Sequence, residues 1–272
     1  MSTDPRSAAL ADPMSVIHLE VSDRIATVRL NRPEARNALS SEVIRLLEVA
    51  MAVADDDADS DVIILTGTDP AFSAGLDLKE LGSTGDNLRA GGASGATAER
   101  RGPWAPTRKP VIGAVNGVAV TGGFELALNC DFLVASDRAR FADTHARVGV
   151  MPGWGLTVLL AEAVGVRRAR ELSYSGNFLT ADRAFAWGLV NHVVEHDDLI
   201  PFTRRLAADI AGNDARGVQR MRATYTAVTD VAPGEGWMVE SRMGREWAAG
   251  GIDPAAVEAR RQRIVERGRS QL

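Results

Sequence analysis

The chain brings small residues and a carboxylate together where a hydrophobic run ends. Val111–Val115 has the composition of a strand and leads through Asn116-Gly117 to the pair Gly122-Gly123 and then to Glu125. Adjacent glycines let a ligand come close because neither has a Cβ. A helix that begins there directs unbonded N–H groups and its positive dipole end at that ligand, which suits negative charge developing on oxygen. A glycine-containing turn followed by a solvated glutamate explains this segment alone equally well.

A second segment repeats this arrangement. Val62–Thr66 has the pattern of a buried strand, and it is followed by the small residues Ser73-Ala74-Gly75 and by Asp77 at a helical start. Two strand ends, each offering a backbone N–H beside small residues, can form a two-donor oxyanion hole. Such a hole holds an enolate or a tetrahedral oxyanion, and each donor contributes roughly 3 kcal/mol in the transition state.

Four segments, taken in order, resemble the crotonase (enoyl-CoA hydratase/isomerase) superfamily. They are Asn31-Arg-Pro-Glu-Ala-Arg-Asn-Ala-Leu39, Ala71-Phe-Ser-Ala-Gly-Leu-Asp77, Asn116-Gly117 with Gly122-Gly123-Phe-Glu-Leu-Ala127, and Phe141 through Met151-Pro-Gly153. The resemblance implies an α/β fold of the crotonase (ClpP-like) type, a spiral of ββα units with a helical C-terminal region. The alternation of strands and helices by itself favours a doubly wound sheet instead.

The resemblance also implies a ligand. In this family an oxyanion hole polarises the thioester carbonyl of an acyl-CoA, and the matching donors are the backbone N–H groups of Ala74 and Gly122. CoA is part of that substrate, so neither a separate cofactor nor a metal is expected. The positions implied to contact the substrate or its CoA are Ala35, Arg36, Gly75, Leu76, Asp77 and Gly123.

The catalytic pair departs from the family pattern. The family's hydratases use two glutamates that share one water; Glu125 matches the first, but the position of the second holds His145. One interpretation keeps two groups, with Glu125 as base and His145 as acid, because imidazole titrates near pH ~6.5. A second is altered chemistry, such as a 1,3-proton shift, hydrolysis or elimination, and a third leaves His145 filling space. Asp143 either orients the imidazole or forms a surface ion pair with Arg147.

Trp154 and Leu156 stand where the family more often has small residues. If they face the acyl site, they shorten or reshape the pocket. Trp154 in the core or at a subunit contact is the competing interpretation.

The composition limits the class of protein. A chain of 272 residues with 45% hydrophobic and 25% charged content is typical of a soluble globular protein. No apolar run reaches the ~18 residues that span a bilayer, and the net charge of −5 argues against a nucleic-acid partner. The single Cys130 fits a reducing cytoplasm, which is the expected location.

The pattern along the chain predicts three regions. Residues 1–13 are expected to be a flexible leader, because they lack the basic start and apolar middle of a signal peptide. Residues 14–200 form the spiral core, and residues 201–272 form a helical region that covers the acyl site or joins subunits. The resemblance implies a homotrimer or a dimer of trimers. The glycine-rich stretch from Leu81 to Gly95 is predicted to be a mobile loop beside the acyl site or a plain surface insertion.

Local patterns predict the main elements. Val16–Val21 and Ile25–Leu30 form a hairpin, a helix capped by Ser40 or Ser41 runs from Glu42 to about Ala54, and helices dominate after Trp154. The combined prediction is an enoyl-CoA hydratase that acts on 2-enoyl thioesters. The alternatives are another crotonase reaction, such as isomerisation or hydrolysis, and an acyl-CoA-binding protein without turnover.

Overall fold

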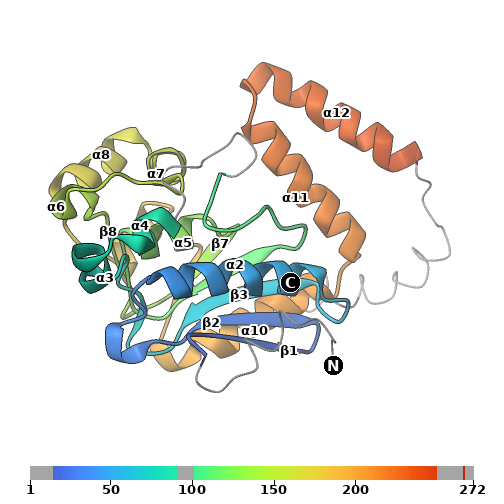
Figure 1. Ribbon diagram of the computed structural model, residues 1–272. Helices are drawn as coiled ribbons and strands as arrows, with labels where there is room; N and C mark the ends of the chain where they lie inside the picture. The colour runs from blue at the N-terminus through green and yellow to red at the C-terminus, as the bar shows by residue number, and fades with distance from the viewer. Residues whose placement is uncertain (1–14, 91–100, 250–265, 267–272) are drawn as a thin grey trace. The chain divides into compact units, whose positions relative to one another are not determined.

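The structure is a computed structural model that describes residues 15–90, 101–249 and 266 (Figure 1). The chain divides into two compact units, Met1–Val218 and Gln219–Leu272. The predicted leader lies outside the described residues, and so do residues 250–272 of the predicted helical region, apart from Glu266.

The first unit is built on a six-stranded sheet among the described residues, in the order β1-β2-β3-β5-β7-β10. β1 and β2 pair antiparallel and the other neighbours pair parallel. The strands are β1 (Ile17–Ser22), β2 (Ile25–Leu30), β3 (Val62–Gly67), β5 (Val111–Val115), β7 (Phe132–Ser136) and β10 (His192–Val194). The predicted hairpin is therefore confirmed, and Asp23 and Arg24 turn it with positive φ angles of 53° and 63°.

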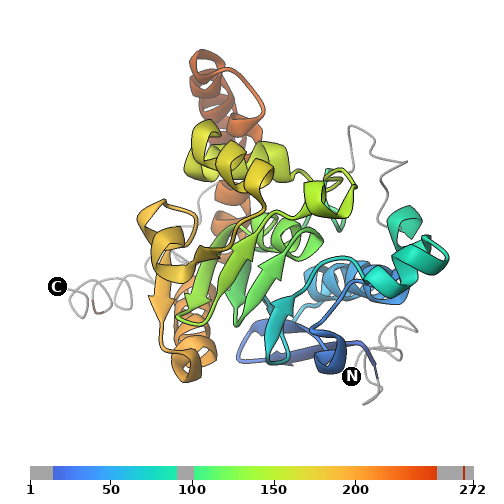
Figure 2. The same ribbon diagram turned by 90° about the vertical axis from the view of Figure 1, so that its left-hand side faces the viewer.

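A second, four-stranded sheet has the order β4-β6-β8-β9 within the described ranges. Its strands are β4 (Ala71–Ser73), β6 (Val118–Val120), β8 (Arg140–Ala142) and β9 (Leu179–Thr180). Each consecutive pair, β3-β4, β5-β6 and β7-β8, contributes one strand to each sheet and then enters a helix. Figure 2 shows these strand pairs side by side between the blue N-terminal hairpin and the orange β10. The repeated ββα unit confirms the predicted spiral, and the doubly wound alternative is wrong.

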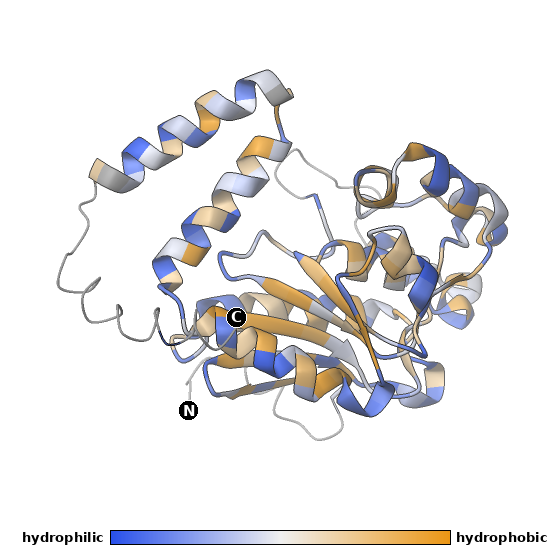
Figure 3. Ribbon diagram, turned by 180° about the vertical axis from the view of Figure 1, so that it is seen from behind, coloured by the Kyte–Doolittle hydropathy of each residue, from blue (hydrophilic) through white to orange (hydrophobic). Residues whose placement is uncertain are grey.

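Helices cover both faces of the six-stranded sheet. Residues alternate along β3: Ile63 and Leu65 join the core beneath α2 (Ser41–Asp56), whereas Val62 and Ile64 join a second cluster with α10 (Leu199–Ala211). Strands buried on both faces read as continuous apolar runs, which Figure 3 shows as orange ribbons in the sheet. Because α10 packs on this sheet, it belongs to the first compact unit.

The remaining helices complete the chain. In the first unit, η1 (Pro33–Ala35), α3 (Leu78–Ser83), α4 (Asp86–Ala90), α5 (Gly122–Leu128), α6 (His145–Val148), α7 (Leu156–Val164), α8 (Val166–Ser175), α9 (Ala181–Ala186) and η2 (His196–Asp198) surround the sheets. α11 (Ala215–Thr229) crosses from the first unit into the second, where α12 (Pro233–Ala249) follows. None of the helices in the described ranges has the length and apolar character that a membrane crossing requires.

The stretch predicted to be a mobile loop is partly helical. α3 and α4 occupy residues 78–83 and 86–90, and residues 91–95 lie outside the described part. Asp77 caps α3, because its Oδ1 accepts hydrogen bonds from the N–H groups of Lys79 (3.0 Å) and Glu80 (3.3 Å). The prediction of a loop was wrong for residues 81–83 and 86–90. The Asp77 cap and contacts with distant residues stabilise helices there despite the glycine-rich composition.

Candidate active site

Glu125 lies in the first turn of α5 and is held in one orientation. Its side chain is buried, and Oε1 accepts hydrogen bonds from the backbone N–H groups of Trp154 (2.7 Å) and Leu156 (3.4 Å). Both donors belong to the segment that enters α7, 29 and 31 residues along the chain. Two main-chain donors on one oxygen leave the other, Oε2, to face its neighbour His145.

His145 stands between two carboxylates. Its Nε2 is 3.4 Å from Glu125 Oε2, and its Nδ1 is 2.6 Å from Asp143 Oδ1. The same Asp143 oxygen accepts the backbone N–H of His145 at 3.1 Å. Because a carboxylate only accepts hydrogen bonds, Nδ1 carries a proton and the ring is fixed with Nε2 toward Glu125. Of the two predicted roles for Asp143, the structure supports orientation of the imidazole, and Arg147 instead bonds to Ser175 and Asn177.

The two carboxylates hold a proton on the imidazole. Burial disfavours the charged ring, but hydrogen bonds and charge from Asp143 and Glu125 outweigh it and raise the pKa of His145 from 6.5 to about 9. Burial also works against the charge on Asp143, but hydrogen bonds from His145 and Ser173 lower the pKa of that carboxyl. At neutral pH the site therefore contains an imidazolium between two acidic side chains.

Two glycines let the strand ends meet beside Glu125. Gly75 has φ +84°, and a Cβ there would lie 2.5 Å from the Val120 carbonyl oxygen and 3.4 Å from the Gly122 nitrogen. A Cβ on Gly123 would lie 2.4 Å from the Ser73 carbonyl oxygen. Neither position has room for a side chain, so both glycines are needed for the close packing of these segments.

The predicted oxyanion donor Ala74 must be corrected. Its N–H donates to the carbonyl oxygen of Arg36 at 2.9 Å, so it is already engaged in the fold. Leu76 differs from Ala74. The N–H of Leu39 donates to the carbonyl oxygen of Gly75, and the carbonyl oxygen of Leu39 accepts the N–H of Asp77. Both bonds go to the neighbours of Leu76, so the N–H of Leu76 takes no part in this pairing. No hydrogen bond joins the backbone N–H of Leu76 or of Gly122 to an acceptor among the described residues.

Leu76 and Gly122 border one small pocket with a cavity volume of about 30 Å³. Its polar side chains come from Glu125, His145 and Asn87, and the walls between them are largely apolar. Trp154 is buried and lines the pocket, so it shapes the pocket and also packs in the core. The full lining is Leu76, Asn87, Leu88, Gly122, Glu125, His145, Met151, Gly153 and Trp154.

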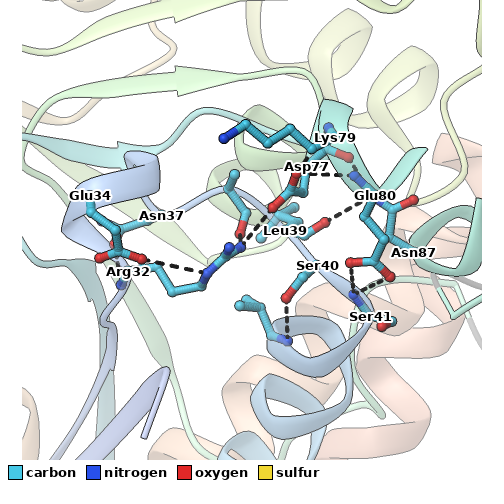
Figure 4. A network of polar contacts seen from close by, with 12 residues as sticks. Arg32, Glu34, Asn37, Leu39, Ser40, Ser41, Asp77, Lys79, Glu80 and Asn87 are labelled. Atoms are coloured by element: carbon cyan, nitrogen blue, oxygen red, sulfur yellow. Dashed lines mark hydrogen bonds and ion pairs between the residues drawn. The ribbon is translucent and has the colours of Figure 1, made fainter. Parts of the chain in front are cut away.

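Of the residues predicted to contact CoA, one borders this pocket and others have structural roles. Asp77 Oδ2 pairs with Arg32 at 3.1 Å while Oδ1 caps α3, as Figure 4 shows. Ala35 ends η1, and Arg36 follows it with φ +51° and directs its carbonyl to Ala74. Leu76 is the one of these residues that borders the pocket.

Sequence reasoning missed three residues near the site. Arg32 pairs with Asp77, Glu80 accepts the N–H of Ser41 with both oxygens, and Asn87 bonds to the carbonyls of Leu39 and Asp77 (Figure 4). These contacts join segments up to 48 residues apart, and no local pattern signals them. Arg32 lies within the first motif of the resemblance, which is the one signal that could have drawn attention to it.

The model of the family described as "Enoyl-CoA hydratase/isomerase" matches residues 20–249. The chain belongs to the enoyl-CoA hydratase/isomerase family. This agrees with the ββα spiral.

Individual members of the family are similar over most of the chain. A probable peroxisomal enoyl-CoA hydratase 1 of Arabidopsis thaliana is 39% identical over 202 residues, which are 74% of this chain and 75% of that protein. A crotonyl-CoA hydratase of Syntrophomonas wolfei is 35% identical over 209 residues, 76% of this chain and 80% of that protein. The crystal structure of an enoyl-CoA hydratase from Mycobacterium tuberculosis H37Rv superposes with a TM-score of 0.72 at 44% identity, covering 85% of this chain and 98% of that one.

Proposed function

We propose that this protein is an enoyl-CoA hydratase that adds water across the C2=C3 bond of 2-enoyl-CoA thioesters. The observation that carries the proposal is the Glu125–His145 pair, 3.4 Å apart, in a pocket that Leu76 and Gly122 also line. Family membership supports the ligand class, and relatives named as hydratases support the reaction.

The oxyanion hole in this proposal consists of the N–H groups of Leu76 and Gly122. Both have no acceptor within the described chain, and both belong to residues that line the pocket. Two such donors bind the thioester oxygen more strongly as it gains negative charge in the enolate, so they lower the barrier to attack at C3. Leu76 takes the role that the sequence assigned to Ala74.

Glu125 and His145 supply the proton transfers. Two atoms 3.4 Å apart can share one water at about 3 Å from each. Glu125 accepts a proton from this water as its oxygen bonds to C3, and the C2=C3 electrons move onto the thioester oxygen. The imidazolium of His145 then gives its Nε2 proton to C2 as the enolate collapses. A pKa of about 9 keeps that proton available at neutral pH.

The direct contact between the pair also restores the starting state. After one turnover Glu125 holds the proton of the water and His145 is neutral. The proton passes from Oε2 to Nε2 across their contact, so the net change is addition of one water to the substrate. The balance requires no separate cofactor, because CoA enters and leaves as part of the thioester.

Hydration of crotonyl-CoA tests the proposal. Loss of the conjugated enoyl thioester absorbance should be seen with the natural chain and should fall at least about 100-fold in Glu125→Gln, which removes the base. Tight binding of crotonyl-CoA without loss of absorbance would instead identify an acyl-CoA-binding protein. Movement of the double bond in a 3-enoyl-CoA without hydration of crotonyl-CoA would identify an isomerase.

A further inference from the structure

Trp154 forms the inner wall of the candidate active-site pocket. It is 6% exposed and belongs to the core cluster, whereas Met151, which also lines the pocket, is 79% exposed. Met151 therefore stands at the mouth of the pocket and Trp154 at its closed side. Because the CoA part of a thioester is far larger than this pocket, it stays at the mouth, and the end of the acyl chain points toward Trp154.

The indole ring of Trp154 reaches the neighbourhood of a proposed oxyanion donor. Its Cζ3 lies 3.5 Å from the point where a Cβ on Gly122 would stand, and Cδ1 of Leu39 lies 3.0 Å from the same point. These are contact distances, so the indole and the Leu39 side chain already fill the space beside Gly122. A thioester whose oxygen binds the N–H of Gly122 therefore has the indole close to its acyl carbons.

The backbone of Trp154 is fixed on both sides. Its N–H donates to Glu125 Oε1 at 2.7 Å, and its carbonyl oxygen accepts a hydrogen bond from Asn129 Nδ2 at 2.8 Å. A shift of this segment that made room for a longer acyl chain would break the hydrogen bond that orients Glu125. The inner wall is therefore coupled to the carboxylate of the proposed base.

The space in front of this wall is small. The cavity measures about 30 Å³, and roughly 10–15 Å³ are needed for each water-sized group, so about two or three such groups fit. The carbons of a crotonyl group beyond its thioester carbon match this space, whereas those of a 2-octenoyl group exceed it.

We propose that Trp154 limits the length of the acyl chain, so that the preferred substrates are short 2-enoyl-CoA thioesters of about crotonyl size. This inference rests on the proposed function, because it assigns the pocket to an acyl-CoA. A short chain ends in contact with the indole. A longer chain has to displace a ring that packs in the core or turn back into water at the mouth, and both weaken binding.

Binding of saturated thioesters of increasing length tests the inference without turnover. The probes are butanoyl-CoA, hexanoyl-CoA and octanoyl-CoA, measured with the natural chain by titration calorimetry. We expect the affinity to fall about tenfold or more from butanoyl-CoA to octanoyl-CoA. An open apolar channel would give the opposite trend, since each CH₂ that it buries strengthens binding about fourfold. An affinity that rises with chain length, or stays equal, overturns the inference.

Matched variants assign the limit to Trp154. Trp154→Leu should turn the falling series into a rising one, and Trp154→Phe, which keeps more of the core packing, should give an intermediate series. Trp187→Leu should keep the natural order, because Trp187 lies under the guanidinium groups of Arg168 and Arg183 and not on the pocket lining. A falling series, or no binding, in both Trp154 variants would overturn the assignment. If no thioester binds the natural chain, the proposed function fails too; if all bind without the fall, only this inference fails.

Discussion

His145 owes its chemical character to the two carboxylates that hold it. A free imidazole is mostly neutral at pH 7, whereas here Asp143 and Glu125 overcome burial and raise its pKa to about 9. A pair of glutamates would have to keep one proton between two like charges, but a glutamate and an imidazolium attract one another. In the proposed function, the exchange of side-chain type at this position therefore preserves an acid beside a base.

Replacing His145 should abolish the acid without removing the pocket. In His145→Gln the side chain keeps a similar length but has no proton to give, so hydration of crotonyl-CoA should fall by about 10²–10⁴-fold. The dissociation constant for a saturated acyl-CoA should change only a few-fold, since the proposed oxyanion donors are backbone groups. An unchanged hydration rate would show that position 145 lies outside the chemistry.

Removal of the Asp143 charge should be visible in the pH profile. The charged His145 is favoured in the folded state, so its contribution to stability is complete below pH 6.5 and is lost as pH rises toward about 9. In Asp143→Asn one of the two carboxylates that raise the pKa of His145 has lost its charge, so burial brings that pKa down. The loss of stability and the alkaline limb of kcat/KM should therefore both move to lower pH. The measurements are crotonyl-CoA hydration and urea unfolding from pH 6 to 10. Asp59→Asn, an exposed change of equal charge, should leave both curves in place, and an unmoved limb in Asp143→Asn would contradict the role of Asp143.

At the level of elements, the turn from β6 into α5 adopts a backbone conformation that suits glycine. Thr121 has φ +52° and ψ −116°, the mirror image of an extended conformation, immediately before Gly122. Its hydroxyl bonds to that of Thr144, the residue before His145, and its N–H donates to the Ala142 carbonyl at 2.9 Å. These contacts hold a strained residue next to Gly122, the proposed oxyanion donor, and link it to the residue before His145.

The strain predicts an inverted order of stability at position 121. Thr121→Gly and Thr121→Ala both lose the hydroxyl, but glycine adopts this backbone freely and alanine does not. The glycine variant should therefore be more stable by about 1 kcal/mol or more, opposite to the usual preference for alanine over glycine. Urea unfolding of both variants measures the difference. Thr144→Ala removes the same hydrogen bond without relieving the backbone, and equal stability of the two Thr121 variants would show that the turn is not strained.

Elements with a strong local pattern were predictable, and those that depend on distant contacts were not. The bounds of β5 match the prediction because it is a short apolar run that begins after Pro110 and ends at Asn116. α3 and α4 were missed because capping by Asp77 and the bonds of Asn87 act across a glycine-rich segment. In the site, Glu125 and His145 follow from motif spacing. Ala74 was wrong because motif spacing does not reveal which of three neighbouring N–H groups the fold already uses.

At the scale of the whole molecule, the second compact unit has few ways to bury its own apolar side chains. α11 and α12 expose Met221 and Tyr225 on one helix and Trp237 and Met238 on the other, each with at least 61% of its surface accessible. Single exposed apolar residues are ordinary, but a group of large ones on two adjacent helices is typical of an association surface. This supports the expectation that the chain forms trimers or pairs of trimers.

The assembly should therefore depend on these helices. We expect the natural chain to sediment as a trimer or hexamer, and the double variant Met221→Glu with Tyr225→Glu to dissociate, because both side chains lie on one face of α11, four residues apart. Ala223→Glu is the control, since position 223 is exposed on the opposite side of the same helix. Sedimentation velocity at micromolar concentration distinguishes these outcomes. A monomeric natural chain, or a double variant that assembles as the control does, would exclude this face of α11 from the subunit contact.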